Sequence, residues 1–270
     1  MDIKKYFSKK AKDIDDFLKE KISELENKEL KKAIEYGLFT GGKRLRPVLA
    51  IALGDILAVS ENLKYFASSI EILHNASLFH DDLPIMDNDD LRRGKPTVHK
   101  KFSPAIALLA GDAMISFANE VIIASDYSET VKNALLKLLN KAWGIDGVCG
   151  GQALEIRAEE GEKVHPFEIF KRKTGALFGA VFKGIAILKD LSEKEQNDFY
   201  LIGENSGIIF QINDDLDDRE DKNYNSLSYF TEDELKKEKE IIVEKTLKMI
   251  HNYKLSKFPL MEILEFIWRI

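Results

Sequence analysis

With 270 residues, 44% of them hydrophobic, the chain can bury a substantial core, and its net charge of −6 without a long basic tract argues against a nucleic-acid partner. Its single cysteine, Cys149, excludes an intrachain disulfide and fits a reducing compartment. The N-terminus lacks the apolar run of a signal peptide, and no stretch of about 18 uninterrupted apolar residues occurs, so we expect a cytoplasmic protein without a membrane span.

Apolar residues recur at helical spacing along most of the chain, and no convincing series of strands and turns interrupts them. We therefore predict an all-α fold, with helices over 10–25, 29–37, 46–58, 62–82, 104–125, 129–143, 166–188, 193–218 and 231–252. Loops are predicted at 41–42, 83–103, 144–151 and 219–230. No composition shift or linker divides the sequence, so we predict one domain over residues 1–270.

The predicted helix over 62–82 ends in an acidic run, within the stretch FHDDLPIMDNDDLRRGKP. Pro84 disfavours helical geometry at Leu83, so the helix that carries His74 should end or kink at Asp81 and Asp82. Carboxylates at the partly negative C-terminal end of a helix are unfavourable unless a cation is bound. Taken alone, the run could equally be hydrated surface.

A second acidic cluster follows another apolar helix, in the stretch FQINDDLDDRED. Spacings of three and four should place four side chains on one helix face: Gln211, Asp214, Asp215 and Asp218. Neither cluster has the central glycine and closing glutamate of a calcium-binding EF-hand. Carboxylates without cysteine favour Mg²⁺, which takes one or two carboxylates together with water and substrate phosphates. The two clusters could therefore hold several Mg²⁺ ions around a diphosphate.

Basic residues occur at three places from which they could bind phosphate groups. Glycines 41 and 42 precede Lys43, Arg44 and Arg46; Arg92 and Arg93 follow the first acidic cluster; and Lys171, Arg172 and Lys173 precede Thr174. Each group alone is ordinarily surface charge, but their combination with two acidic clusters favours a diphosphate site. His74 lies two helical turns before Asp81 and could donate to a phosphate, although a lone histidine there is more often a core residue.

Together these motifs resemble the trans-prenyltransferases that make farnesyl and geranylgeranyl diphosphate. GKRLRP at 42–47 resembles the family's motif for isopentenyl diphosphate, DDLPIMD at 81–87 its first aspartate-rich motif in the bacterial form, and DDLDD at 214–218 its second. GDA at 111–113, GGQALE at 150–155, KTG at 173–175 and FQ at 210–211 follow in the family's order. The resemblance covers nearly the whole chain.

The resemblance implies an isoprenoid synthase fold, a homodimer of helical bundles, each around a deep central cavity. It implies three Mg²⁺ ions per active site, held mainly by Asp81, Asp87 and Asp214, with Asp82, Asp215 and Asp218 completing the clusters directly or through water. Isopentenyl diphosphate would be held by Lys43, Arg46, His74 and Arg93. The allylic diphosphate would be held by Arg92, Lys173, Thr174 and Gln211, with Lys173 also catalytic and Lys222 as a further diphosphate ligand.

The implied reaction is ionisation of the allylic diphosphate, attack of the isopentenyl double bond on the allylic cation, and loss of a proton to the released diphosphate. Ala76 and Ser77, about one turn before Asp81, are small where the family uses a bulky residue as a floor for the product. Geranylgeranyl diphosphate is therefore favoured over farnesyl diphosphate. Phe79 should point elsewhere, but Phe117 or Ile115 could supply the floor instead.

The sequence departs from the family after the second aspartate motif, where only REDKNYNSLSYF precedes the next predicted helix. The family usually has a longer loop with further lysines, of which Lys222 matches one. Two alternatives therefore stay open. A class I terpene cyclase would explain one aspartate motif but neither the second nor Lys43 and Arg46, and a non-catalytic subunit of a heteromeric synthase would explain the short loop but not the complete aspartates.

Overall fold

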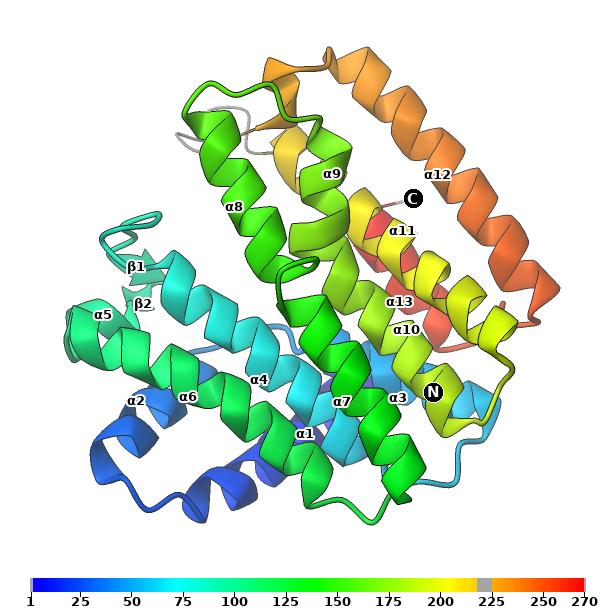
Figure 1. Cartoon of the computed structure of the whole chain (residues 1–270). Coiled ribbons are helices and arrows are strands. Elements are labelled where there is room, and N and C mark those ends of the chain that lie inside the picture. Colours follow the sequence, from blue (N-terminus) through cyan, green and yellow to red (C-terminus); the bar gives the residue numbers. More distant parts are fainter. Residues whose placement is uncertain (1, 218–224, 270) are drawn as a thin grey trace. The chain divides into compact units, whose positions relative to one another are not determined.

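The computed structural model describes residues 2–217 and 225–269, and the chain divides into two compact units (Figure 1). Unit 1 comprises Met1–Ile51 and Glu61–Lys132, and unit 2 comprises Ala52–Ser60 and Asn133–Ile270. The predicted all-α class is confirmed, because the regular secondary structure of the described residues is helical apart from one hairpin of two antiparallel two-residue strands. The prediction of a single domain over the whole chain stays a prediction.

Unit 1 is built on α4 (Leu63–Asp81) and α6 (Pro104–Ile123), which pack along one another (Figure 1). The other elements of this unit are α1 (Ile3–Ser23), α2 (Lys28–Phe39), β1 (Leu91–Arg92), β2 (Lys95–Pro96) and α5 (Val98–Lys101). Asn62 caps α4 by accepting from the backbone N–H of Lys64, and Pro104 occupies the first turn of α6. Ser69 of α4 donates to the carbonyl of Ala118 (2.9 Å), a buried bond that joins the two helices.

The apolar helix α6 is the one described helix that is long and apolar enough to cross a membrane, by length and composition only. Its mean hydropathy is 1.7, and 44% of the apolar window is buried inside the protein. The buried residues of α6 include Ala107, Ala110, Met114 and Phe117, and they face α4 and α2 in the core of unit 1.

Unit 2 is built on α10 (Ala176–Leu188) and α11 (Glu193–Asp217), which also lie side by side (Figure 1). Around them lie α8 (Val148–Glu159), α9 (Pro166–Phe170), η2 (Ser226–Ser228), α12 (Glu232–Asn252) and α13 (Leu260–Trp268). Two helices have residues in both units, α3 (Leu45–Leu57) and α7 (Glu129–Trp143). A π-helical turn, η1 (Lys171–Gly175), connects α9 to α10.

Besides the four-residue α5, which lies inside the loop predicted over 83–103, two α-helices of the described residues were not predicted. Residues 144–151 were expected to be a loop, but α8 begins at Val148, and its two glycines, which disfavour helix, hid it from sequence reasoning. A Cβ atom at Gly151 would lie 2.3 Å from the backbone nitrogen of Lys173, so close packing of α8 against η1 requires glycine there. The second missed helix, α13, has apolar residues at helical spacing in a stretch of nine residues, which is short for a periodicity signal.

Candidate active site

The first acidic segment lies at the C-terminal end of α4. The helix ends at Asp81, as the effect of Pro84 on Leu83 predicts, and Asp82 is its C-cap. A turn follows, in which the backbone N–H of Asp87 donates to the carbonyl of Asp81 (2.9 Å). Both Asp81 and Asp87 are half-buried. The turn therefore holds two carboxylate-bearing residues of unit 1 next to each other in space.

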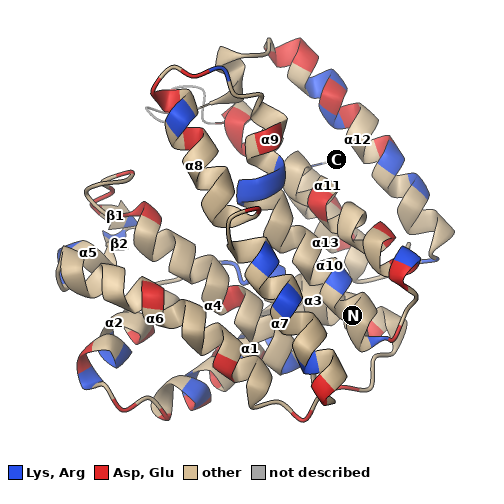
Figure 2. Ribbon diagram, in the orientation of Figure 1, with Lys and Arg blue, Asp and Glu red and all other residues tan. Residues whose placement is uncertain are grey.

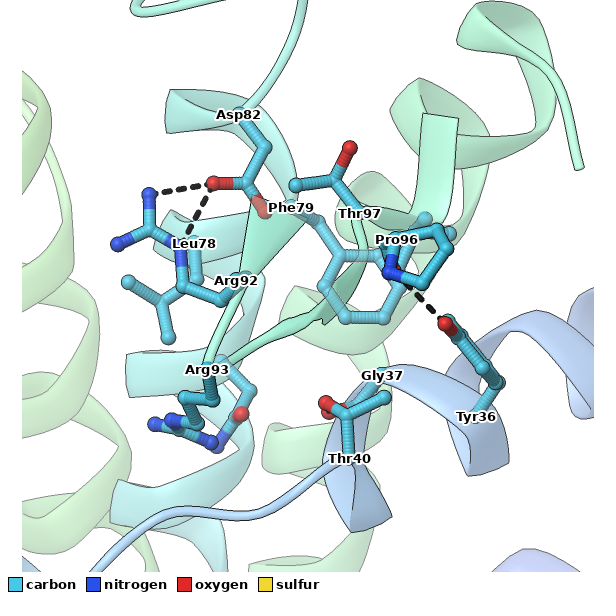
Figure 3. Close-up of a pocket in the computed structure, with 12 residues that line it drawn as sticks. Tyr36, Gly37, Thr40, Leu78, Phe79, Asp82, Arg92, Arg93, Pro96 and Thr97 are labelled. Atoms are coloured by element: carbon cyan, nitrogen blue, oxygen red, sulfur yellow. Dashed lines mark hydrogen bonds and ion pairs between the residues drawn. The ribbon is translucent and has the colours of Figure 1, made fainter. Parts of the chain in front are cut away.

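Asp82 is buried and is paired with a basic residue of the hairpin. The Nε atom of Arg92 donates to Oδ1 of Asp82 (2.8 Å), and Nη2 donates to Oδ2 of Asp89 (2.9 Å). Burial raises the pKa of Asp82, and the guanidinium of Arg92 opposes that rise. Figure 3 shows the two side chains directed at each other beside a pocket formed by α2, α4 and the hairpin. In this structure the carboxylate of Asp82 thus forms an ion pair with the guanidinium of Arg92.

The predicted isopentenyl diphosphate ligands also lie in unit 1. Lys43 and Arg93 are exposed, whereas Arg46 and His74 are half-buried. The Nη1 atom of Arg93 donates a hydrogen bond to the carbonyl of Gly41. Burial lowers the pKa of His74 well below its ordinary value of 6.5, and the charges of nearby arginines, first Arg46, lower it further. His74 is therefore neutral at neutral pH and can donate one N–H.

The second group of predicted site residues lies in unit 2, around η1. Lys173 and Thr174 belong to this π-helical turn, where Figure 2 shows basic residues gathered. The ammonium of Lys173 pairs with the carboxylate of Glu155 on α8. Single π-helical turns occur frequently at functional sites, since they change the direction of side chains within a helix. A pocket here is lined by Glu155, Ile169, Phe170, Lys173, Thr174, Gln211 and Asp215.

A chain of hydrogen bonds connects η1 to the second acidic cluster. The hydroxyl of Thr174 donates to Oε1 of Gln211 (2.7 Å), and Nε2 of Gln211 donates to Oδ1 of Asp215 (2.9 Å). The other carboxylate oxygen of Asp215 accepts from the backbone N–H of Ser226 (2.9 Å). Asp215 is buried, so its carboxylate is committed to these two donors within the fold.

Asp214 is half-buried and lies near the end of α11, where its Oδ1 is 3.6 Å from a guanidinium nitrogen of Arg269. Arg269 follows α13 and also pairs with Asp217. Two predicted site residues, Asp218 and Lys222, lie outside the described residues. The proposed roles of the other residues are not contradicted by where the structure places them, and they stay predictions.

The carboxylates suit Mg²⁺ in type and number. Among residues 2–217 and 225–269, no group of three or more histidine, cysteine, aspartate or glutamate side chains is placed to hold a metal ion. Mg²⁺ does not need such a cage, because it keeps several waters and takes one or two carboxylates together with substrate phosphates. Half-buried Asp81 and Asp87 in unit 1, and Asp214 in unit 2, are donors of this kind.

The two positions predicted to set product length differ in exposure. Ala76 has no exposed surface, whereas Ser77 is half-buried and its hydroxyl donates to the carbonyl of His74 (2.8 Å). Figure 3 shows the ring of Phe79 beside Gly37 of α2, so this side chain is taken up by packing within unit 1. Of the two small residues, Ser77 is therefore the better placed to meet a ligand.

Sequence reasoning missed the partners that hold the predicted ligands. Glu155 had a detectable signal, since it ends the GGQALE motif, but its pairing with Lys173 depends on how α8 packs against η1. The pairing of Glu71 with Arg44 had no detectable signal in the sequence, because 26 residues separate them. The structure joins them in a buried ion pair, Nη1 to Oε1 at 3.2 Å.

Comparisons with known proteins agree with one another. The sequence profile of the polyprenyl synthetase family matches residues 27–256. The chain is 41% identical to farnesyl diphosphate synthase of Haemophilus influenzae over 203 residues, covering 73% of this chain and 69% of that protein. It is 37% identical to geranylgeranyl pyrophosphate synthase 4 of Arabidopsis thaliana over 221 residues, covering 80% of this chain and 59% of that protein. Among solved structures, a geranyltransferase from Legionella pneumophila matches with a TM-score of 0.89 and 30% identity, over 99% of this chain and 97% of that one.

Proposed function

Because this chain belongs to the polyprenyl synthetase family, we propose that it is a short-chain trans-prenyl diphosphate synthase, a prenyltransferase that condenses isopentenyl diphosphate with an allylic diphosphate. One observation carries the proposal: each unit holds an acidic helix end together with side chains that can donate hydrogen bonds to a phosphate. In unit 1 the residues are Asp81, Asp87, Arg93 and His74, and in unit 2 they are Asp214 and Lys173. The condensation of the two diphosphates needs no nucleophilic side chain activated by a base, such as a hydrolase uses.

The family generally uses Mg²⁺, and we propose Asp81, Asp87 and Asp214 as its direct ligands, with Asp82, Asp215 and Asp218 as additional members of the clusters and three ions per active site. When bound, Mg²⁺ would stabilise negative charge on the diphosphate that leaves the allylic substrate. The protein's own cations act in the same direction. Arg92 in unit 1 and Lys173 in unit 2 are proposed to bind the allylic diphosphate, with Thr174 and Gln211 orienting that group.

The isopentenyl diphosphate would be held in unit 1 by Lys43, Arg46, His74 and Arg93. Arginine side chains bind phosphate oxygens through two parallel N–H donors, so they orient the substrate as well as hold it. A neutral His74 adds one donor without adding charge. The isopentenyl double bond then attacks the allylic cation, and a proton is lost to the released diphosphate. No covalent bond to the enzyme is formed.

We propose geranylgeranyl diphosphate as the product in preference to farnesyl diphosphate. The support is the small size of Ser77 and Ala76, of which Ser77 retains accessible surface next to the first acidic segment. The relatives include both farnesyl and geranylgeranyl diphosphate synthases, so similarity alone does not choose between them. A bulky residue at position 77 would shorten the space for a growing prenyl chain.

We also propose that the protein is a cytoplasmic homodimer that uses α6 at its interface and not as a membrane span. Three large apolar side chains of α6 are exposed in the single chain: Leu108 (43%), Leu109 (53%) and Ile123 (57%). Exposed apolar side chains on a helix that is otherwise in the core are typical of an interface between copies. Light scattering of the purified chain without detergent tests this, and a detergent-dependent or monomeric state would count against it.

The direct test is incubation of the purified protein with Mg²⁺, labelled isopentenyl diphosphate and, separately, dimethylallyl, geranyl and farnesyl diphosphate. Elongation with product length read by chromatography is the expected outcome. If the folded protein releases diphosphate and gives a cyclic hydrocarbon, it is a terpene cyclase. If it binds neither substrate, it is a non-catalytic subunit, and the proposal fails.

A further inference from the structure

We propose that Glu71 and Arg44 form a buried positioning pair that holds the isopentenyl-diphosphate-binding cations of unit 1 in place. This inference rests on the proposed function. Both side chains of the pair are buried, so they would not touch the substrate. The two residues come from different elements, Glu71 from α4 and Arg44 from the glycine-containing loop that precedes α3.

The loop places its three cations in different environments. Gly41 and Gly42 have φ angles of +126° and +120°, which glycine adopts without strain, and Arg44 has a φ of +51°, in the left-handed region that other residues rarely occupy. This bend leaves Lys43 at the surface and turns the side chain of Arg44 inward, so that it is 3% exposed. A buried guanidinium in an unusual backbone conformation indicates that its contacts determine the shape of the loop.

Arg44 uses its guanidinium to join three segments of unit 1. Its Nε donates to Oδ1 of Asp15 on α1 (2.7 Å), and Nη2 donates to the carbonyl of Leu38 at the end of α2. Its Nη1 donates to Oε1 of Glu71 (3.2 Å) and to the carbonyl of Gly41 (3.1 Å). The Gly41 carbonyl is also the acceptor for Arg93. Arg44 and Arg93 are thus connected through one carbonyl oxygen.

Glu71 supplies the negative charge at the centre of this group. Its side chain is 2% exposed, and Asn75 donates from Nδ2 to Oε1 (3.0 Å). Within the described part of the chain, Oε2 has no hydrogen-bond partner. Burial raises the pKa of Glu71, and this rise is opposed by Arg44 first, then by Asn75 and by the charges of Arg46 and Arg93. Of these arginines, Arg44 is the one in direct contact with the carboxylate.

Without this carboxylate the arginines would repel one another whenever no diphosphate is bound. Because Glu71 is paired with Arg44, the pair is close to neutral as seen by an incoming diphosphate, so it acts through position and not through net charge. Each proposed ligand is linked to the pair: Arg46 follows Arg44 by two residues, and His74 follows Glu71 by one helical turn of α4. Arg93 shares the Gly41 carbonyl with Arg44. Loosening the pair should therefore weaken binding of isopentenyl diphosphate selectively.

The test compares Glu71→Gln, Arg44→Gln and the double variant with the wild type, in steady-state kinetics with each substrate varied in turn. We expect each single variant to raise the KM for isopentenyl diphosphate about tenfold, equivalent to ~1.4 kcal/mol, with less than about a twofold change in the KM for the allylic substrate. The double variant should be no worse than the singles, because the residues act as one unit. Hydrogen exchange of the amides at 41–46 should be faster in all three.

Ser69→Ala is the matched control, since it removes a buried hydrogen bond of α4 that does not involve the loop. It should lower stability and leave both KM values unchanged. If Glu71→Gln behaves like Ser69→Ala, with normal exchange at 41–46, the pair has only a structural role and the inference is wrong. Should the variants fail to fold, Asp15→Asn tests the same network through its outer partner, which is 32% exposed.

The outcome separates this inference from the proposed function. A wild-type protein that does not elongate any primer refutes the function, whatever the variants do. The exchange experiment then still decides whether Arg44 and Glu71 order the loop. A wild-type protein that elongates, with variants whose KM for isopentenyl diphosphate is unchanged, keeps the function and refutes the pair.

Discussion

The contact between α8 and η1 makes Gly151→Ala a sharp test of how Lys173 is positioned. A Cβ atom at residue 151 would lie 2.3 Å from the backbone nitrogen of Lys173, 2.7 Å from its Cα and 2.9 Å from the carbonyl carbon of Arg172. All three neighbours are backbone atoms, so no side chain can rotate away. To restore a 3.0 Å separation, η1 must move relative to α8 by about 0.7 Å.

Two effects on stability oppose each other in this variant. Alanine is about 1 kcal/mol better than glycine in a helix interior, which stabilises α8. Overpacking against a rigid backbone costs about 1–3 kcal/mol, so we expect a net loss of up to about 2 kcal/mol in the free energy of unfolding. Catalysis should be more sensitive than stability, since misplacing a reacting group by about 1 Å can lower the rate by about a hundredfold.

The measurements are urea unfolding followed by circular dichroism and kcat at saturating substrates. Ala153→Gly is the matched control, because residue 153 is exposed on the same helix and its change tests helix propensity alone. We expect Gly151→Ala to lower kcat at least about tenfold while Ala153→Gly leaves it within about twofold. A Gly151→Ala protein that is both more stable and fully active would refute the packing and the role of Lys173 together.

Three further predictions follow from the site. Asp81→Ala and Asp214→Ala should each lower kcat/KM by roughly a hundredfold or more with helix content unchanged, and a loss under about tenfold (~1.4 kcal/mol) would show that these carboxylates do not hold the essential metals. His74 has a pKa below 6.5 in the folded state, so the unfolded state takes up its proton first and the free energy of unfolding falls as pH drops below 6.5; His74→Gln should flatten this part of the stability profile, and an unchanged slope in urea titrations would contradict it. Ser77→Tyr should shorten the product seen by chromatography, whereas Ala76→Tyr should chiefly lower the melting temperature, because residue 76 is fully buried.

Periodic helices were predictable because their signal is local. The helices over 62–82, 104–125, 129–143 and 231–252 agree with the structure within one or two residues at each end. Capping residues reinforce such boundaries, as in α12, where Thr231 and Glu234 form a capping box. The π-helical turn inside the predicted helix over 166–188 was not predictable, since its sequence is compatible with an ordinary helix.

The sequence by itself determined the helical class, the family and the residues that carry charge at the ends of α4 and α11, because periodicity and motif order are properties of the chain alone. Only the tertiary structure decided how those charges are used. It showed that Arg44 turns inward to Glu71, that Arg92 binds Asp82, and that glycine lets α8 approach the backbone of Lys173. These pairings depend on which side chains lose their water together, and that is settled by packing between elements distant in the sequence.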